Sequence, residues 1–65
     1  MKGTIKFYDK KKGYGFITSS EDDRDYFLHI SQLLPGKKPF TGDKVSFVPK
    51  ETEKGLQARE VSFVE

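Results

Sequence analysis

No stretch of this chain carries apolar residues at helical spacing over ten positions, and this constrains its fold more than any other feature. Apolar, β-branched and aromatic residues instead gather in short segments separated by glycine, proline and acidic turns. Ile30 to Leu34 is the nearest helix candidate, and Pro35 and Gly36 end it after one turn, so we expect a short 3₁₀ turn there. The pattern therefore predicts an all-β protein.

Five segments have the composition of β-strands and follow one another at roughly ten-residue spacing, without room for crossover helices. They are Gly3 to Asp9, Tyr14 to Ser19, Asp25 to Ile30, Lys44 to Val48 and Leu56 to Val64. The first two form a hairpin across a lysine-rich turn, and Pro49 to Gly55 is expected to be a charged loop. This arrangement predicts an antiparallel barrel or sandwich, and a closed barrel leaves no exposed sheet edges.

Length and composition narrow the function classes. Sixty-five residues provide one small core, so residues 1–65 are expected to form a single domain. The chain has no cysteine, which excludes disulfides and thiolate chemistry and favours a cytoplasmic location. No membrane-spanning run or signal peptide is found, and the one histidine, His29, has no second base in sight. We therefore expect no catalysis, no metal, no cofactor and no membrane partner.

Alternation gives two of these strands apolar residues on both faces. The residues expected to fill the barrel are Ile5, Ile17, Leu28, Val45, Val61, Phe47 and Phe63, with Tyr26 as a further candidate. Four rings are not needed for this core, namely Tyr14, Phe16, Phe27 and His29. Pairing of their two strands across the short acidic turn would cluster these rings on one outer surface. Exposed rings cost solubility unless a ligand binds there, although alternation alone leaves ordinary core packing equally open.

Positive charge lies next to these rings. Residues 1–20 carry five lysines against one aspartate, whereas residues 21–25 carry four acidic residues against one arginine. Bases of a single strand stack on rings at about 1–3 kcal/mol each while lysines neutralise phosphates, so the combination favours single-stranded nucleic acid. For Lys10, Lys11 and Lys12 the alternative is an ordinary solvated turn.

Phe7 and Gly15 carry two further expectations. Alternation puts Phe7 on the same face as Ile5, so Phe7 reaches the outer rings only if a β-bulge intervenes. A bulky side chain at Gly15 would crowd the inner face, and Gly13 and Gly15 leave the Tyr14 ring uncovered.

Two motifs carry a family resemblance. The segment KGYGFI at residues 12–17 resembles the first ribonucleoprotein motif, and YFLH at residues 26–29 resembles the second. Their order is the reverse of that in RRM domains, and Ser19 stands where the RRM motif wants an aromatic residue. With a Lys-aromatic-aromatic segment in the first strand and Gly-x-Gln-Ala opening the last, the whole chain resembles a bacterial-type cold-shock domain.

The resemblance implies a five-stranded antiparallel OB-fold barrel that binds single-stranded RNA and DNA with low sequence specificity and a pyrimidine preference. It also implies an RNA chaperone with a role in transcription antitermination or translation under cold stress. The nucleic-acid contacts that it implies are Lys6, Phe7, Lys12, Tyr14, Phe16, Phe27, His29, Ile30, Phe40, Lys54, Gln57 and Ala58. Phe7 stands where the family usually has tryptophan, and Ile30, where an aromatic residue is common, removes one stacking platform. Capping of the barrel is the alternative role for Phe40.

A different class of function is also open. A small SH3-like interaction barrel could grip a proline-rich peptide through the aromatic patch. Grooves of that type often carry acidic residues beside the rings, whereas lysines surround them here. We expect a monomer, because no second apolar patch is evident in the sequence.

Overall fold

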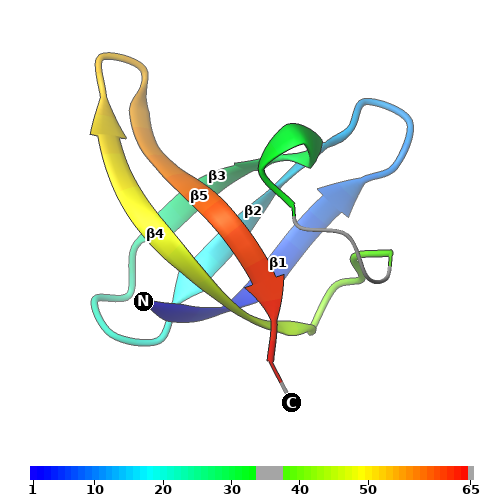
Figure 1. Ribbon diagram of the computed structural model, residues 1–65, viewed down its shortest axis with the longest axis horizontal. Coiled ribbons are helices and arrows are strands. Elements are labelled where there is room, and N and C mark those ends of the chain that lie inside the picture. Colours follow the sequence, from blue (N-terminus) through cyan, green and yellow to red (C-terminus); the bar gives the residue numbers. More distant parts are fainter. Residues whose placement is uncertain (34–37, 65) are drawn as a thin grey trace.

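The computed structural model describes residues 1–33 and 38–64, whose strands close into a five-stranded OB-fold barrel (Figure 1). The strands are β1 (Lys2–Asp9), β2 (Tyr14–Ser19), β3 (Asp25–His29), β4 (Lys44–Thr52) and β5 (Gly55–Phe63), and the 3₁₀ turn η1 (Ile30–Gln32) follows β3. The expected all-β barrel and the expected short turn are both confirmed. The last residue of that turn as predicted from sequence, Leu34, lies outside the described residues.

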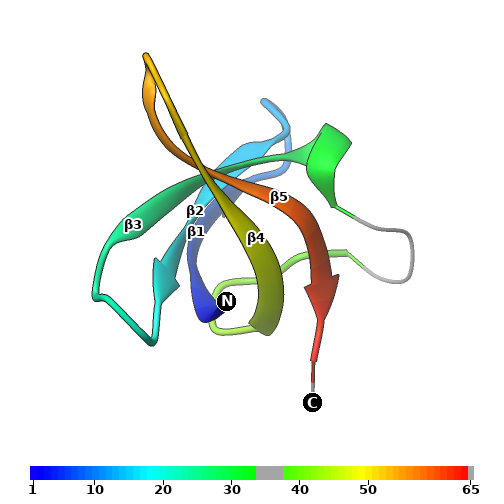
Figure 2. The same ribbon diagram turned by 60° about the vertical axis from the view of Figure 1, so that its left-hand side comes forward.

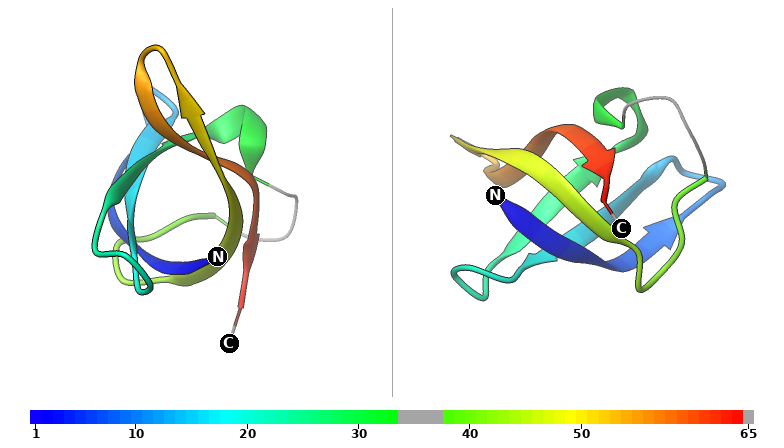
Figure 3. Two further views of the ribbon diagram at one scale, coloured as in Figure 1. Left: turned by 90° about the vertical axis from the view of Figure 1, so that its left-hand side faces the viewer. Right: turned by 60° about the horizontal axis from the view of Figure 1, so that its bottom comes forward.

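Strand order around the barrel is β1-β2-β3-β5-β4, and β4 pairs back onto β1 to close it. The left panel of Figure 3 looks through this ring of strands. The pairing of β3 with β5 is parallel, whereas the other neighbours pair antiparallel. The expectation of a wholly antiparallel barrel is therefore wrong at this seam. Because β4 runs back between them in the chain, β5 runs in the same direction as β3 when it closes the barrel.

The β4–β5 hairpin is longer than the sequence predicts. Pro49 to Gly55 was expected to be a charged loop, but β4 continues to Thr52 and β5 begins at Gly55. Pairs from Pro49 opposite Ala58 to Thr52 opposite Gly55 extend the ladder to the tip. Figure 2 shows this hairpin projecting beyond the barrel. Lys50 and Lys54 are exposed on this hairpin.

The core confirms most of the alternation argument. The hydrophobic core consists of eight side chains that are each at most 3% exposed, namely Ile5, Ile17, Tyr26, Leu28, Val45, Phe47, Ala58 and Val61. Phe63, which was expected in the core, is only partly buried and packs against its edge. The rings of Tyr26 and Phe47 pack with centroids 5.0 Å apart, so they fill the barrel together.

Two irregularities decide which side chains face outward. The register between β1 and β2 shifts between Ile5 and Phe7, so these two residues can face opposite sides of the sheet. The register between β4 and β5 shifts between Ser46 and Val48, next to Glu60, whose φ of 48° is left-handed. The second shift allows β5 to bury both Ala58 and Val61, which strict alternation would place on opposite faces.

Candidate nucleic-acid interface

Pairing of β2 with β3 assembles a row of rings on the outer face of the barrel. Tyr14 lies opposite His29, and Phe16 lies opposite Phe27. The Phe27 ring is central: its centroid is 5.8 Å from that of Tyr14, 5.8 Å from that of Phe16 and 6.4 Å from that of His29. Phe16 is 37% exposed, while the core on the other side of the sheet is filled by other residues. The cluster expected from alternation is therefore present and faces solvent.

The β-bulge adds Phe7 to this surface. Phe7 pairs with Phe16 across β1 and β2 and is 46% exposed, whereas Ile5 is 1% exposed. The bulge required by the sequence argument is thus confirmed. Gly15 allows the close approach of the two strands at this point, because a Cβ atom there would overlap the Phe7 carbonyl oxygen and lie 2.8 Å from Tyr8 Cα. We call Phe7, Tyr14, Phe16, Phe27 and His29 the aromatic face.

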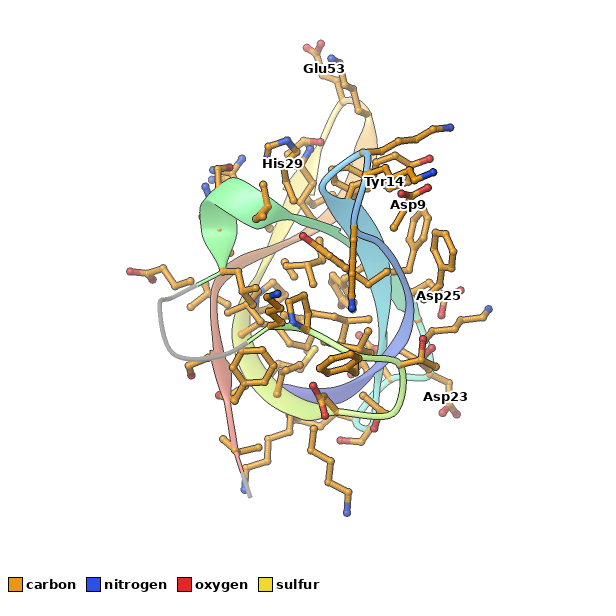
Figure 4. The ribbon with its side chains drawn as sticks, turned by 90° about the vertical axis from the view of Figure 1, so that its right-hand side faces the viewer. Asp9, Tyr14, Asp23, Asp25, His29 and Glu53 are labelled. Atoms are coloured by element: carbon orange, nitrogen blue, oxygen red, sulfur yellow. The ribbon has the colours of Figure 1, made fainter. Side chains whose placement is uncertain are left out.

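The turn between β1 and β2 is held by Asp9. Its Oδ1 accepts hydrogen bonds from the backbone N–H groups of Lys11 (2.9 Å) and Lys12 (3.1 Å). Gly13 then takes a left-handed φ of 73°, and its carbonyl oxygen accepts from the Ile30 N–H at 2.9 Å. Figure 4 shows Asp9 and Tyr14 next to each other at this turn. The lysine side chains at residues 10–12 are exposed beside the rings.

Ile30 and Phe40 both present apolar surface to solvent. Ile30 is 52% exposed at the start of η1, and Phe40 is 53% exposed. The ammonium group of Lys10 lies 4.4 Å from the centroid of the Phe40 ring, in cation–π geometry. Capping of the barrel by Phe40 is therefore excluded, and its ring lies on the Lys10 side of the turn.

Lys6 is held by an acidic neighbour. Its Nζ donates to Asp25 Oδ2 at 3.0 Å, and Thr18 Oγ1 donates to the other oxygen of the same carboxylate at 2.9 Å. These hydrogen bonds, first that from Lys6 and then that from Thr18, hold the pKa of Asp25 below its usual value. Both partners are exposed, so a phosphate can compete for the lysine.

A second acidic side chain is anchored in the turn between β2 and β3. Tyr26 Oη donates to Asp22 Oδ2 at 2.7 Å, which lowers the pKa of Asp22 and raises that of Tyr26. Asp25 and Asp23 lie along this side of the molecule in Figure 4. Negative charge therefore bounds the aromatic face at the end opposite the lysine-rich turn.

The β5 strand extends the face beyond the rings. A shallow hollow is lined by Phe16, Phe27, Asp25, Lys54, Leu56 and Gln57. Gln57 pairs with Phe27 across the parallel seam, so its amide lies beside the central ring. A ring, an amide and a lysine thus meet at one place, as a nucleotide with its base and phosphate requires.

Two residues of β5 differ from expectation. The resemblance implied Ala58 as a contact, but its side chain is 1% exposed and lies in the core. The register shift at Glu60 explains this, because it allows Ala58 and Val61 to point inward together. The same shift turns Arg59 outward beside Gln57, a residue that sequence reasoning missed. Strict alternation from Val61 would have placed Arg59 in the barrel, whereas alternation from Gln57 places it on the outer face, so the sequence held conflicting signals.

Across residues 1–33 and 38–64, no group of His, Asp and Glu side chains is arranged to hold a metal ion. No helix in the same ranges is long and apolar enough to cross a membrane.

A barrel of this topology with rings and cations on its outer face defines a class, the OB-fold proteins that bind nucleic acid. The family model described as 'Cold-shock' DNA-binding domain matches residues 1–64. The chain belongs to the cold-shock domain family.

Relatives of known name agree with this assignment. The chain is 45% identical over 67 residues to a cold shock-like protein of Thermotoga maritima, with both chains fully covered. It is also 45% identical over 64 residues to the major cold shock protein CspA of Pseudomonas aeruginosa, covering 95% of this chain and 91% of that one.

A solved structure has the same fold. The structure titled drosophila Unr CSD456 superposes with a TM-score of 0.83 at 26% identity, covering 98% of this chain and 26% of that one. The barrel is thus similar to a part of a longer protein as well as to small bacterial ones.

Proposed function

We propose that this protein binds single-stranded RNA and DNA with low sequence specificity and acts as an RNA chaperone. The observation that carries the proposal is the aromatic face, which gathers five rings on the outside of a barrel whose core is complete without them. Exposed rings in contact with each other are a stacking surface for unpaired bases. Bases inside a duplex are already stacked, so the face discriminates against double strands.

Each part of the face has a role in this mechanism. Bases stack on Phe7, Phe16 and Phe27, with Tyr14 and His29 at the rim near the lysine-rich turn. Phosphates are neutralised by the exposed lysines Lys6, Lys12 and Lys54, which lie on both sides of the rings. Gln57 offers its amide to the edge of a base on Phe27, while Ile30 and Phe40 add apolar contact beyond η1. Ala58 contributes only its backbone, because its side chain is buried.

The chaperone action needs no chemical energy. A protein that binds only the open strand shifts the equilibrium between paired and unpaired RNA by its differential affinity. Lys6 has to leave Asp25 to meet a phosphate, so binding at this end is an exchange of one anion for another. We accordingly expect affinity that falls with added salt.

Family membership supports the finer features of the proposal. These are the preference for pyrimidines and a role in transcription antitermination or translation under cold stress. A cytoplasmic location fits the bacterial relatives and the absence of cysteine. We further propose a single-domain monomer, which light scattering after size-exclusion chromatography tests. The SH3-like peptide barrel is not retained, because the chain belongs to a nucleic-acid-binding family.

The test is a fluorescence-anisotropy titration of labelled heptathymidine at several salt concentrations, beside the same label on a duplex. The chain has no tryptophan, so the label provides the signal. We expect micromolar or tighter binding to the single strand, weaker binding to the duplex, and a log–log salt slope of about −0.7 per phosphate contact. Equal binding to both forms, or none, would overturn the proposal.

A further inference from the structure

Arg59 occupies a place on the interface that family resemblance does not assign to it. The parallel seam pairs Phe27 with Gln57 and Leu28 with Ala58, and both Leu28 and Ala58 point into the core. The next residue along each strand therefore points outward, and these residues are His29 on β3 and Arg59 on β5. On β5, Arg59 thus continues the row of outward-facing residues formed by Tyr14 and His29.

Arg59 is held in position by its neighbour. Its Nη2 donates to Gln57 Oε1 at 2.9 Å, which also fixes the Gln57 amide with its NH₂ group free to donate. The Arg59 side chain is half-buried on the outer surface of the sheet. A planar guanidinium fixed in this way loses little further freedom when it binds an oxyanion.

Arg59 forms no salt bridge in the part of the chain that the structure describes. The one ion pair there joins Lys6 to Asp25. The Arg59 Nε–H is shielded from solvent and has no hydrogen-bond partner, so the free protein leaves a donor unsatisfied. A half-buried cation without a counter-ion is stabilised when an anion binds against it.

The surface connects Arg59 to the aromatic face. One hollow runs from Phe16 and Phe27 to Lys54 and Gln57, and a second is lined by Gln57, Lys54 and Arg59 together with the hairpin tip. Because the two hollows share Gln57 and Lys54, a strand leaving the rings has a continuous path to the guanidinium. Glu53 at the tip of the hairpin (Figure 4) bounds this path on its far side.

We propose that Arg59 forms a phosphate subsite, which binds the sugar–phosphate backbone of the nucleotide adjoining the base on Phe27. The proposal rests on the single-strand binding proposed above. Arg59 acts there by its charge and by the guanidinium N–H groups that Gln57 does not occupy, while Gln57 reads the neighbouring base. This subsite makes β5 a second line of phosphate contact, separated from the lysine-rich β1–β2 turn by β3.

The first test compares Arg59→Gln with Arg24→Gln, the other arginine of the chain, which lies in the acidic turn. Binding of labelled heptathymidine is measured for both variants and wild type between 50 and 200 mM salt. If Arg59→Gln loses one phosphate contact, the magnitude of its log–log salt slope is smaller than that of wild type by about 0.7. The ratio of the variant's Kd to the wild-type Kd therefore falls about threefold as salt rises from 50 to 200 mM. Arg24→Gln leaves the slope unchanged, and Arg59→Lys keeps it because the charge remains.

The second test needs no variant, so it holds even if Arg59→Gln fails to fold. In the ¹H–¹⁵N spectrum of the wild-type protein, the Nε–H resonance of Arg59 shifts when heptathymidine is added, while that of Arg24 stays in place. If the protein binds heptathymidine but the Arg59 resonance does not move, and Arg59→Gln has the same salt slope as wild type, the phosphate subsite is overturned while the proposed function stands. A protein that does not bind heptathymidine overturns the proposed function and the subsite together.

Discussion

Replacing Gly15 with alanine tests how closely β1 and β2 approach under the aromatic face. The added Cβ would overlap the Phe7 carbonyl oxygen and lie 2.8 Å from Tyr8 Cα, where ordinary contact begins at 3.4 Å. Both obstacles are backbone atoms, so no side chain can rotate away. The two strands have to separate by about 1 Å, against a normal spacing of about 4.8 Å.

The size of the effect follows from what this separation disrupts. Pairs Phe7–Phe16 and Tyr8–Gly15 loosen, at about 0.5–1.5 kcal/mol for each backbone hydrogen bond, and overpacking adds about 1–3 kcal/mol. We expect a loss of about 2–4 kcal/mol, out of a total of about 3–10 kcal/mol for a domain of this size. The melting temperature should then fall by at least about 8 °C.

Thermal unfolding by circular dichroism measures this loss, and amide hydrogen exchange locates it. Gly55→Ala is the control, since Gly55 has a φ of 118° and no atom within 4 Å of an added Cβ. That change adds backbone strain at the hairpin tip but leaves exchange at Phe7 and Phe16 slow. A Gly15→Ala protein that melts within 2 °C of wild type, with β1–β2 amides still protected, would refute the close approach.

Three further changes have expected outcomes. The pKa of Asp25 is lowered by Lys6 and Thr18, so its contribution to stability is full above the unfolded pKa of about 4 and is lost as pH falls through the folded value. Urea unfolding should therefore show wild type more stable than Asp25→Asn at pH 7 and the two converging near pH 2; a constant difference would contradict the cause. Phe40→Ala should cost less than about 0.5 kcal/mol in the same assay, and a loss above 2 kcal/mol would return Phe40 to a capping role. Leu28→Ala, at a position that is 0% exposed, should cost about 2–5 kcal/mol, and a near-neutral result would contradict its place in the core.

The core could be predicted because alternation is a local property. Ile17 and Leu28 sit in uninterrupted strands, so the side that each faces follows from counting residues. The aromatic face on β2 and β3 could be expected for the same reason, since one face of each strand was already needed for the core.

β-Bulges limit how far the inward or outward direction of a side chain can be predicted by counting residues along a strand. The sequence did not predict the bulge before Phe7; it showed only that Phe7 could face outward if a bulge were present. The one at Glu60 had no such signal, because a left-handed non-glycine residue is uncommon and no glycine marks the position. Its consequence is that Ala58 and Val61 both point into the core while Arg59 points outward.

The extent of β4 was missed because proline usually marks the end of a strand. In the described residues, Phe47 is the last residue of β4 bonded on the β1 side, where it exchanges two hydrogen bonds with Met1. Beyond Phe47, β4 pairs with β5. Pro49, which has no N–H to donate, is tolerated on this open side. Knowing which strand edges are free requires the closed topology, which local sequence does not contain.

The most direct test of the account is the binding of labelled heptathymidine by Phe16→Ala/Phe27→Ala, with Val48→Ala as a control. Val48 is 49% exposed on β4 and has no ring, so this variant removes exposed apolar surface without removing a stacking platform. Loss of two platforms at about 1–3 kcal/mol each predicts binding at least about 30-fold weaker, with the barrel still folded and Val48→Ala close to wild type. A folded double variant that binds heptathymidine as tightly as wild type would contradict base stacking on the aromatic face.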